Sequence, residues 1–264
     1  LYRNPLLSCT SSNNVDFARI QERKTNVITQ LREGVKGLLS TPGITYIEGE
    51  AKFIDKKIIE VNGTQMTADN IIIATGSHAR LLPFIPAFNT PEGEALKNKV
   101  LTSTELLDID HVPQTMAIIG AGVIGLELAS AFETFGSKVT VIEFLKECLP
   151  SIDSDIAKRL RKTLEKRGIN FNMNSGVKSI VATEDKKQAI VTFEQKGQEK
   201  KVIADIVLVA TGRAANIEGL GLEIAGINCV KQGIETNEHY ETNIPGVYAV
   251  GDVNGKQMLA HAAS

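Results

Sequence analysis

The sequence predicts an α/β protein with two related units, and three observations carry this prediction. A strand, a glycine-rich turn and a helix follow one another over residues 115–135. Strands and helices alternate from there to residue 173, which implies parallel strands joined by right-handed crossovers. An antiparallel meander, a buried strand and Ala-Thr-Gly also occur twice, with the tripeptide at residues 74–76 and 210–212. This internal similarity suggests two related units. Only in the second is the meander preceded by a strand, a glycine-rich turn and a helix.

The first hundred residues predict a helix followed by short strands. Apolar residues at three-, four- and seven-residue spacings give residues 17–38 one helical face, and Thr41-Pro42-Gly43 ends it. Short β-type runs follow at residues 44–53, 57–61 and 70–74, with turns at 55–56 and at Asn62-Gly63. Residues 82–91 contain several prolines and predict a connection between domains.

From about residue 101 the predicted strands and helices alternate. The expected elements are a strand at 115–119, a helix at 123–135, a strand at 138–143, a helix at 156–166 and a strand at 169–173. A second meander at 176–182, 189–195 and 200–203 then leads into a buried strand at 205–212.

Composition narrows the possible partners. The 264 residues are 42% hydrophobic and 23% charged, and 29 basic against 31 acidic residues give a net charge of −2. A near-neutral chain lacks the basic footprint that nucleic acid or an anionic membrane would require. Its apolar runs are too short to span a bilayer. Three dispersed cysteines, Cys9, Cys148 and Cys229, indicate neither a disulfide scaffold nor a zinc site, so we expect a cytoplasmic protein.

The strongest motif is Gly120-Ala121-Gly122-Val123-Ile124-Gly125, which links a predicted strand to a predicted helix. In that context Gly120 makes the tight turn, Gly122 lets the backbone approach a pyrophosphate, and Gly125 lets the helix pack closely. The helix N-terminus supplies N–H donors and a positive dipole. An ordinary strand-to-helix turn is the alternative, and the context favours a dinucleotide cofactor.

One of two acidic residues near this motif favours NAD. Glu143 ends the next strand, where a carboxylate accepts hydrogen bonds from the adenosine ribose and repels a 2′-phosphate. A solvated glutamate at a strand end is the weaker alternative. Glu127 lies near the helix N-terminus, where compensation of the helix dipole is a sufficient explanation by itself.

The remaining candidate residues keep a plain alternative. Asp252 follows a buried run and either faces a ligand hydroxyl in the crevice at the strand ends or is an ordinary turn residue. His261 ends an apolar run, where a lone histidine is more often packed or capping than catalytic. None of the cysteines has a neighbour arranged to activate it, and no histidines lie at metal-ligand spacing, so no metal site is predicted.

Taken in order, these motifs resemble the pyridine nucleotide-disulfide oxidoreductases, flavoproteins with FAD and NAD(P) domains. The series comprises Ala74-Thr75-Gly76-Ser77, residues 120–125 with Glu127 and Glu143, Ala210-Thr211-Gly212-Arg213, residues 249–253 and residues 258–261. Within the family, the runs at 123–128 and 141–145 are most similar to the branch that oxidises dihydrolipoamide with NAD. The resemblance implies two Rossmann-like FAD/NAD(P)-binding units with β-meanders, the FAD unit being incomplete.

The resemblance also implies two groups of cofactor-binding residues. For NAD these are Gly120, Ala121, Gly122, Val123, Ile124, Gly125, Glu127, Glu143, Val177 and Gly212. For FAD they are Ala51, Thr75, Gly76, Ser77, Asp252, Met258, Leu259, Ala260 and His261. In the complete enzyme the family implies a homodimer whose partner is dihydrolipoamide, or the lipoyl domain of a 2-oxo acid or acetoin dehydrogenase complex.

Departures from the family pattern concern the catalytic centre. The sequence lacks two cysteines separated by four residues. We do not recognise the strand, glycine-rich turn and helix with which the FAD unit should begin. We also do not recognise an interface domain with a His–Glu pair. His261 belongs to the flavin-side motif and is not that base. Ala215 and His78-Ala79 stand where proline is usual. We therefore expect a fragment with no catalytic residue, in which residues 102–231 form an NAD-binding domain and residues 1–101 with 232–264 a partial FAD-binding domain.

The expected parent reaction is the flavin-dependent oxidation of dihydrolipoamide to lipoamide, with reduction of NAD to NADH. Another NADH-dependent flavin disulfide reductase or an NADH oxidase shares these motifs. A non-catalytic nucleotide-binding module is the alternative from a different class. For the chain alone we expect NAD binding, weak or absent FAD binding, and no turnover.

Overall fold

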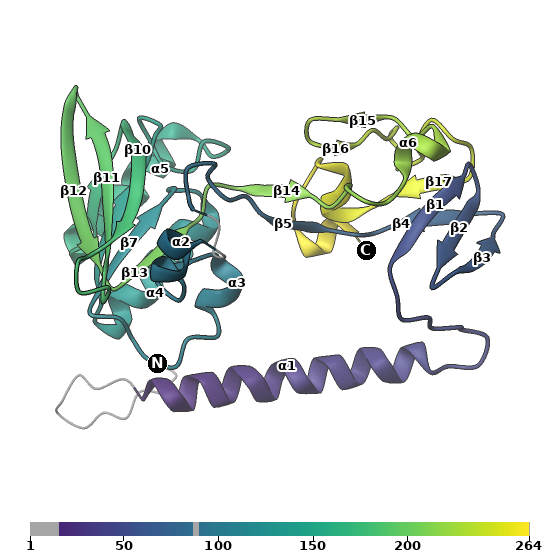
Figure 1. The fold of residues 1–264 in the computed structure, drawn as a ribbon, viewed down its shortest axis with the longest axis horizontal. Helices are drawn as coiled ribbons and strands as arrows, with labels where there is room; N and C mark the ends of the chain where they lie inside the picture. Colours follow the sequence, from purple (N-terminus) through teal and green to yellow (C-terminus); the bar gives the residue numbers. More distant parts are fainter. Residues whose placement is uncertain (1–15, 87–89, 264) are drawn as a thin grey trace. The chain divides into compact units, whose positions relative to one another are not determined.

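The computed structural model describes residues 16–86 and 90–263, and it divides into two compact units. Unit 1 comprises the described residues up to Leu31 together with Ala79–Gly212, and unit 2 comprises Arg32–His78 with Arg213–Ser264 as far as they are described. Each unit contains paired parallel strands and an antiparallel meander, which confirms the predicted α/β class (Figure 1). These boundaries follow contacts within the chain. The division by cofactor, with residues 102–231 assigned to NAD, stays a prediction.

A five-stranded parallel sheet forms the centre of unit 1, in the order β6-β13-β7-β8-β9. Its strands are β6 (Val100–Leu101), β13 (Ile206–Val209), β7 (Thr115–Ile119), β8 (Lys138–Ile142) and β9 (Asn170–Asn172). Strand β7 pairs with β8 from Thr115↔Lys138 to Ile119↔Ile142. Its residues 116–119 are buried, as expected for a parallel strand covered on both faces. The β-α-β-α-β order predicted from the sequence is confirmed.

Two helices connect these strands, and their ends follow local sequence signals. Helix α4 (Val123–Phe135) ends at Gly136, which adopts a left-handed φ of 106°. Helix α5 (Ser154–Arg167) begins at Asp153, whose side chain accepts hydrogen bonds from the backbone N–H groups of Asp155 and Ile156. Helix α4 has the predicted bounds, whereas α5 starts two residues earlier than the apolar pattern indicated.

An antiparallel meander in the order β10-β11-β12 packs onto the sheet of unit 1 (Figure 1). Its strands are β10 (Ser175–Ala182), β11 (Ala189–Gln195) and β12 (Gln198–Ala204). Ile180, Val191 and Phe193 are almost fully buried and share a core cluster with Ile119 and Val209 of the sheet. The second predicted meander is thereby confirmed.

Two short helices that were not predicted follow the predicted connection at residues 82–91. Helix α2 (Pro91–Leu96) has Thr90 as its N-cap and a proline in its first turn. Helix α3 (Ser103–Leu106) begins with a capping box made by Thr102 and Glu105. Both signals are present in the sequence, but each helix is too short to show apolar periodicity.

Helix α1 (Phe17–Leu39) matches the predicted helix, and its apolar face lies largely exposed. None of its residues is buried, and four side chains of the predicted face are 46–70% exposed: Val27, Leu31, Val35 and Leu38. Only the start of that face has an aromatic contact, where the Phe17 ring lies 5.7 Å from that of Phe135. No helix in the described part of the chain is long and apolar enough to cross a membrane.

Unit 2 contains a second meander and a pair of parallel strands. The meander is formed by β1 (Ala51–Asp55), β2 (Ile58–Val61) and β3 (Thr64–Thr67), whereas β4 (Ile71–Ile73) pairs in parallel with β17 (Val247–Ala249). The run at 44–53 was therefore predicted too long, and β3 was missed. Asn62 and Gly63 both have positive φ, 52° and 77°, which confirms the predicted hairpin turn.

The smaller elements of unit 2 complete its core. They are α6 (Leu222–Ala225), β15 (Cys229–Val230), β16 (Gly233–Ile234) and the 3₁₀ turns Gly251–Asn254 and Ala260–Ala263. Phe53, Ile73, Leu222, Ile234 and Val247 share one buried cluster. The short strands β5 (Ser77–Ala79) and β14 (Arg213–Ala215) pair with each other.

Candidate functional site

Three neighbouring parallel strands of unit 1 end at one edge of the sheet, and the predicted NAD-binding residues follow them. Strand β7 lies between β13 and β8, with Ile119 paired to Val209 on one side and to Ile142 on the other. Gly212 follows β13, residues 120–125 follow β7, and Glu143 follows β8. The fold therefore brings these segments together where ligands bind in open α/β sheets.

The glycines of the turn after β7 have different structural reasons. Gly120 has a φ of 105°, and a Cβ there would lie 2.4 Å from the carbonyl oxygen of Ala210. A Cβ on Gly125 would lie 2.2 Å from the carbonyl oxygen of Gly120, so the helix can start this close only with glycine. A Cβ on Gly122 would meet nothing within 4 Å. The space in front of Gly122 is open, which fits the close approach of a pyrophosphate to its backbone.

Helix α4 points its N-terminus toward this open space. Its N-cap is Gly122, which makes no side-chain capping hydrogen bond, and its first turn contains no acidic residue. The first N–H groups of a helix lack partners inside the helix and carry the positive end of its dipole. This end of α4 can therefore hold an anion. Glu127 lies further along α4 with its side chain exposed.

The carboxylate of Glu143 is fixed against the glycine turn. Its Oε2 accepts the N–H of Ala121 at 2.5 Å, and its Oε1 accepts the N–H of Leu145 at 2.8 Å. The residue is only 9% exposed. A carboxylate has about four lone-pair sites, so these two bonds leave acceptor capacity for hydroxyl donors. Sequence reasoning anticipated a ribose-binding carboxylate but not its role in holding the turn.

Strand β10 brings Val177 to the same edge. The N–H of Ser175 donates to the carbonyl oxygen of Glu143 at 2.8 Å, which joins the start of β10 to the end of β8. Val177 follows two residues later, at a bulge between residues 177 and 179, and its side chain is half-buried. All ten predicted NAD-binding residues are therefore in unit 1, and the sheet edge gathers most of them.

In unit 2 the predicted FAD-binding residues Ser77 and Asp252 contact each other. The Ser77 hydroxyl donates to Oδ2 of Asp252 at 2.5 Å. Arg213 Nε donates to Ser77 Oγ at 2.6 Å, and Arg213 Nη2 donates to the Ser77 carbonyl at 2.7 Å. Asp252 Oδ2 also lies 3.7 Å from Arg213 Nε. Arg213 belongs to the Thr-Gly-Arg motif, and no sequence pattern predicts this contact with Ser77 and Asp252.

Other predicted FAD-binding residues of unit 2 lie in two places. Ala51 and Thr75 line a cavity of about 100 Å³, and Gly76 follows directly after Thr75. Thr75 is held by Asn216, since its hydroxyl donates to the Asn216 carbonyl and its own carbonyl accepts from the Asn216 amide, both at 2.8 Å. Residues 258–261 (Met258, Leu259, Ala260 and His261) are exposed. Asn216 is a further residue that the sequence analysis did not single out.

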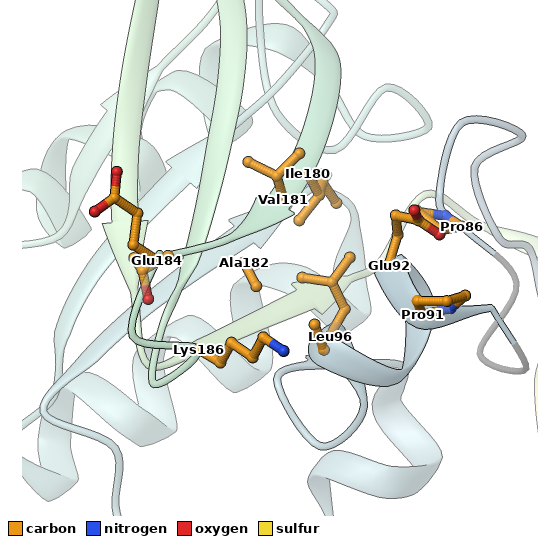
Figure 2. A pocket seen from close by; sticks show the side chains of 11 residues that line it. Pro86, Pro91, Glu92, Leu96, Ile180, Val181, Ala182, Glu184 and Lys186 are labelled. Atoms are coloured by element: carbon orange, nitrogen blue, oxygen red, sulfur yellow. The ribbon is translucent and has the colours of Figure 1, made fainter.

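Unit 1 contains a larger pocket, of about 420 Å³. It coincides with neither the predicted NAD-binding residues nor the predicted FAD-binding residues. Figure 2 shows Leu96 of α2 on one side and Ile180 and Val181 of β10 on the other, with Glu92, Glu184 and Lys186 at its rim. None of its lining residues is a predicted cofactor-binding residue. Although this pocket is large, its lining residues give no reason to regard it as the cofactor-binding or active site.

The two cysteines that the structure describes are free thiols with raised pKa values. Cys148 is buried, and loss of solvation together with the neighbouring Glu147 carboxylate raises its pKa to about 11. Cys229 is exposed, and partial loss of solvation, with a smaller contribution from Glu223, raises its pKa. The thiolate is the reactive form of cysteine, and the surroundings of both Cys148 and Cys229 disfavour the thiolate. Cys9 lies outside the described residues, and no metal-binding cluster of three His, Cys, Asp or Glu side chains is found among those described.

Parallel strands that end at a glycine-rich turn, an uncapped helix N-terminus and a strand-end glutamate are an arrangement typical of dinucleotide-binding α/β proteins. A family model described as pyridine nucleotide-disulphide oxidoreductase matches residues 1–264. The chain belongs to this family.

Known relatives refine this assignment. The chain is 39% identical to a dihydrolipoyl dehydrogenase of Acholeplasma laidlawii over 97% of this chain and 73% of that protein. It is 37% identical to one of Geobacillus stearothermophilus over 95% of this chain and 52% of that protein. Among solved structures, the HOCl-induced flavoprotein disulfide reductase RclA from Escherichia coli matches with a TM-score of 0.82 and 31% identity, covering 94% of this chain and 55% of that one. The chain thus spans about half the length of several relatives that it matches.

Proposed function

We propose that this chain provides the NAD site of a flavin-dependent enzyme that oxidises dihydrolipoamide to lipoamide and reduces NAD to NADH. The family supports a flavin-dependent oxidoreductase, and the relatives named dihydrolipoyl dehydrogenase support this substrate. On the same basis, the complete enzyme is a homodimer that serves the lipoyl domain of a 2-oxo acid or acetoin dehydrogenase complex.

The position of Glu143 is the observation that carries the choice of NAD. Its carboxylate is held beside the glycine turn by the N–H groups of Ala121 and Leu145. A ribose with two free hydroxyls can donate to the remaining lone pairs of this carboxylate. A 2′-phosphate would instead bring two like charges together in a partly desolvated place.

The other residues of this edge bind and orient the dinucleotide. The open backbone at Gly122 and the N-terminus of α4 bind the pyrophosphate, and Val177 and Gly212 border the same edge from β10 and β13. Glu127 is assigned to the nicotinamide side. When bound, NAD supplies the acceptor for hydride. The protein residues fix its position and its charge environment.

In unit 2, Asp252 and Ser77 are assigned to FAD, together with Ala51, Thr75, Gly76 and residues 258–261. The sequence contains a single Gly-x-Gly-x-x-Gly motif, and it belongs to the NAD edge. A flavin dinucleotide needs such a cradle for its own pyrophosphate. We therefore propose that this chain alone holds FAD weakly or not at all.

We also propose that this chain alone does not turn over dihydrolipoamide. The reaction requires exchange between the substrate dithiol and a protein disulfide, together with a base for the thiol proton. Cys148 and Cys229 are free thiols with raised pKa, and the sequence contains no two cysteines separated by four residues. No residue of the chain is assigned a catalytic role.

A second candidate function is a different NADH-dependent flavoprotein disulfide reductase, and the likeness to RclA favours it. The two candidate functions differ in their substrate, so substrate assays on the protein isolated from its source distinguish them. Reduction of NAD with dihydrolipoamide supports the first. Failure of that reaction, together with NADH-dependent reduction of another disulfide, supports the second.

The first prediction tests the NAD site by titrating the chain with NADH and with NADPH. We expect NADH to bind on the order of a hundredfold more tightly, because Glu143 binds ribose hydroxyls and repels a 2′-phosphate. Glu143→Gln should narrow this ratio. Glu127→Gln is the matched control, because Glu127 is the other acidic residue of the proposed NAD site and is assigned to the nicotinamide side. This change should leave the ratio of NADH to NADPH affinity unchanged. Equal affinity for both nucleotides, or tighter binding of NADPH, would show that Glu143 does not select NAD.

A further inference from the structure

Phe144 is an exposed aromatic residue directly after Glu143. With 76% of its surface accessible, it is the most exposed large hydrophobic side chain in the part of the chain that the structure describes. Single exposed hydrophobic residues are common on protein surfaces, so exposure alone indicates no function. The surroundings of Phe144 make it different from such residues.

The backbone on both sides of Phe144 is fixed by hydrogen bonds to neighbouring segments. The N–H of Glu143 donates to Asn172 at 2.9 Å, and the carbonyl of Glu143 accepts from Ser175 at 2.8 Å. The carbonyl of Leu145 accepts from Asn174 at 3.0 Å. The Leu145 N–H donates to the Glu143 carboxylate at 2.8 Å. An exposed ring therefore projects from a backbone that is held in place.

The Phe144 ring also lies against a glycine. A Cβ placed on Gly176 would be 3.7 Å from Cδ2 and 3.9 Å from Cε2 of the ring. Glycine at this position of β10 leaves the ring close to the strand without a side chain between them. One part of the ring is thus supported by β10, while most of its surface remains open to solvent.

We propose that Phe144 is the stacking surface for the adenine of the dinucleotide. This inference rests on the proposed function, because it takes Glu143 as the residue that binds the adenosine ribose. The adenine is attached to that ribose, so it must lie within a few ångströms of Glu143, and Phe144 is the adjacent residue. Bases stack on aromatic rings through their faces, and a ring on a fixed backbone beside β10 has less freedom to lose on binding. Phe144 therefore contributes affinity for the adenosine half and none for the nicotinamide half.

The second prediction tests this division with three ligands. The chain and its Phe144→Ala variant are titrated by calorimetry with NADH, with ADP-ribose, and with reduced nicotinamide mononucleotide, which lacks the adenosine. We expect the variant to bind NADH and ADP-ribose about tenfold more weakly. Binding of the mononucleotide should not change. Phe144→Tyr keeps the ring and should keep the parent affinity, whereas Phe144→Leu keeps apolar volume without the ring and should lose it.

Ile203→Ala is the matched control, because Ile203 is a large hydrophobic residue of β12 in the same unit and is 52% exposed. This change should leave all three affinities unaltered. If the parent chain binds NADH and Phe144→Ala binds it equally well, the inference is wrong and the proposed function stands. An equal loss for the mononucleotide would also overturn it. If the parent chain does not bind NADH, the proposed NAD site itself is wrong.

Discussion

The third prediction concerns Glu147→Gln, which removes the charge from a carboxylate paired with Arg161. Arg161 Nε lies 2.7 Å from Oε1 of Glu147, and Nη2 lies 3.0 Å from Oε2, so the pair is bidentate. The side chain of Glu147 is only 20% exposed and that of Arg161 only 18%. The hydrogen bonds from Arg161 lower the pKa of Glu147 from 4.5 to about 2. Glu147 lies between β8 and α5, so the pair anchors that connection to the helix.

The size of the effect follows from this lowered pKa. At about 1.36 kcal/mol per pKa unit, the drop corresponds to an upper limit of about 3 kcal/mol. Partial exposure screens the pair, and glutamine can still accept one hydrogen bond from Arg161. We therefore expect Glu147→Gln to lower the free energy of unfolding by about 1–2 kcal/mol near neutral pH.

The pH dependence has a definite direction. The folded-state pKa of Glu147 lies below its unfolded value, so folding favours the charged carboxylate. This contribution is complete above the unfolded pKa of 4.5 and is lost as the pH falls through about 2. The stability difference between parent and variant should therefore fall by about half between pH 5 and pH 3.

Urea denaturation followed by circular dichroism at each pH measures this difference. Glu165→Gln is the control, since Glu165 pairs with the same arginine but is more exposed, at 38%. An exposed pair of this kind contributes about 0.3–0.5 kcal/mol. The reasoning would be refuted if Glu147→Gln were as stable as the parent near neutral pH, or if its deficit were the same at pH 5 and pH 3.

Two further predictions concern the glycine turn and the cysteines. Gly125→Ala should destabilise the chain by about 1–3 kcal/mol and abolish NADH binding, because its Cβ would lie 2.2 Å from the Gly120 carbonyl. Gly122→Ala should weaken NADH binding while leaving urea stability unchanged, since its Cβ meets no protein atom within 4 Å; equal destabilisation by both would contradict this. With an alkylating reagent at mildly alkaline pH, peptide mapping should find native Cys229 modified and Cys148 protected until urea unfolds the chain, because Cys148 is buried and its pKa is about 11. Rapid labelling of native Cys148 would show that its surroundings are misjudged.

The sequence predicted best the elements in which several signals agree. Strand β7 and helix α4 have the predicted bounds, because a buried apolar run, a glycine turn and helical periodicity follow one another there. Strand β3 was missed since Thr64–Thr67 has no apolar alternation. The run before β1 contains Ile44, Tyr46 and Ile47, which suggested a strand, yet these side chains are exposed and form no strand.

The candidate sites were predictable to different extents for a topological reason. The carboxyl ends of neighbouring parallel strands meet at one edge, so the positions proposed to bind NAD could be grouped from strand order alone. The contact between Ser77 and Asp252 joins residues 175 positions apart, and that between Ser77 and Arg213 joins residues 136 positions apart. No local pattern places such residues together, so the contacts of Arg213 and the part played by Asn216 emerged only from the structure.

Glu143 holds the glycine turn and is also the residue proposed to bind ribose, and this combination constrains any attempt to re-engineer cofactor preference. A basic residue at this position would attract a 2′-phosphate, but it would offer no acceptor to the N–H of Ala121, which is itself fully buried. Leaving a buried donor without an acceptor costs about 1–3 kcal/mol. A selection for NADPH use should therefore recover basic residues at neighbouring positions, with an acceptor retained at position 143, rather than a direct exchange of charge.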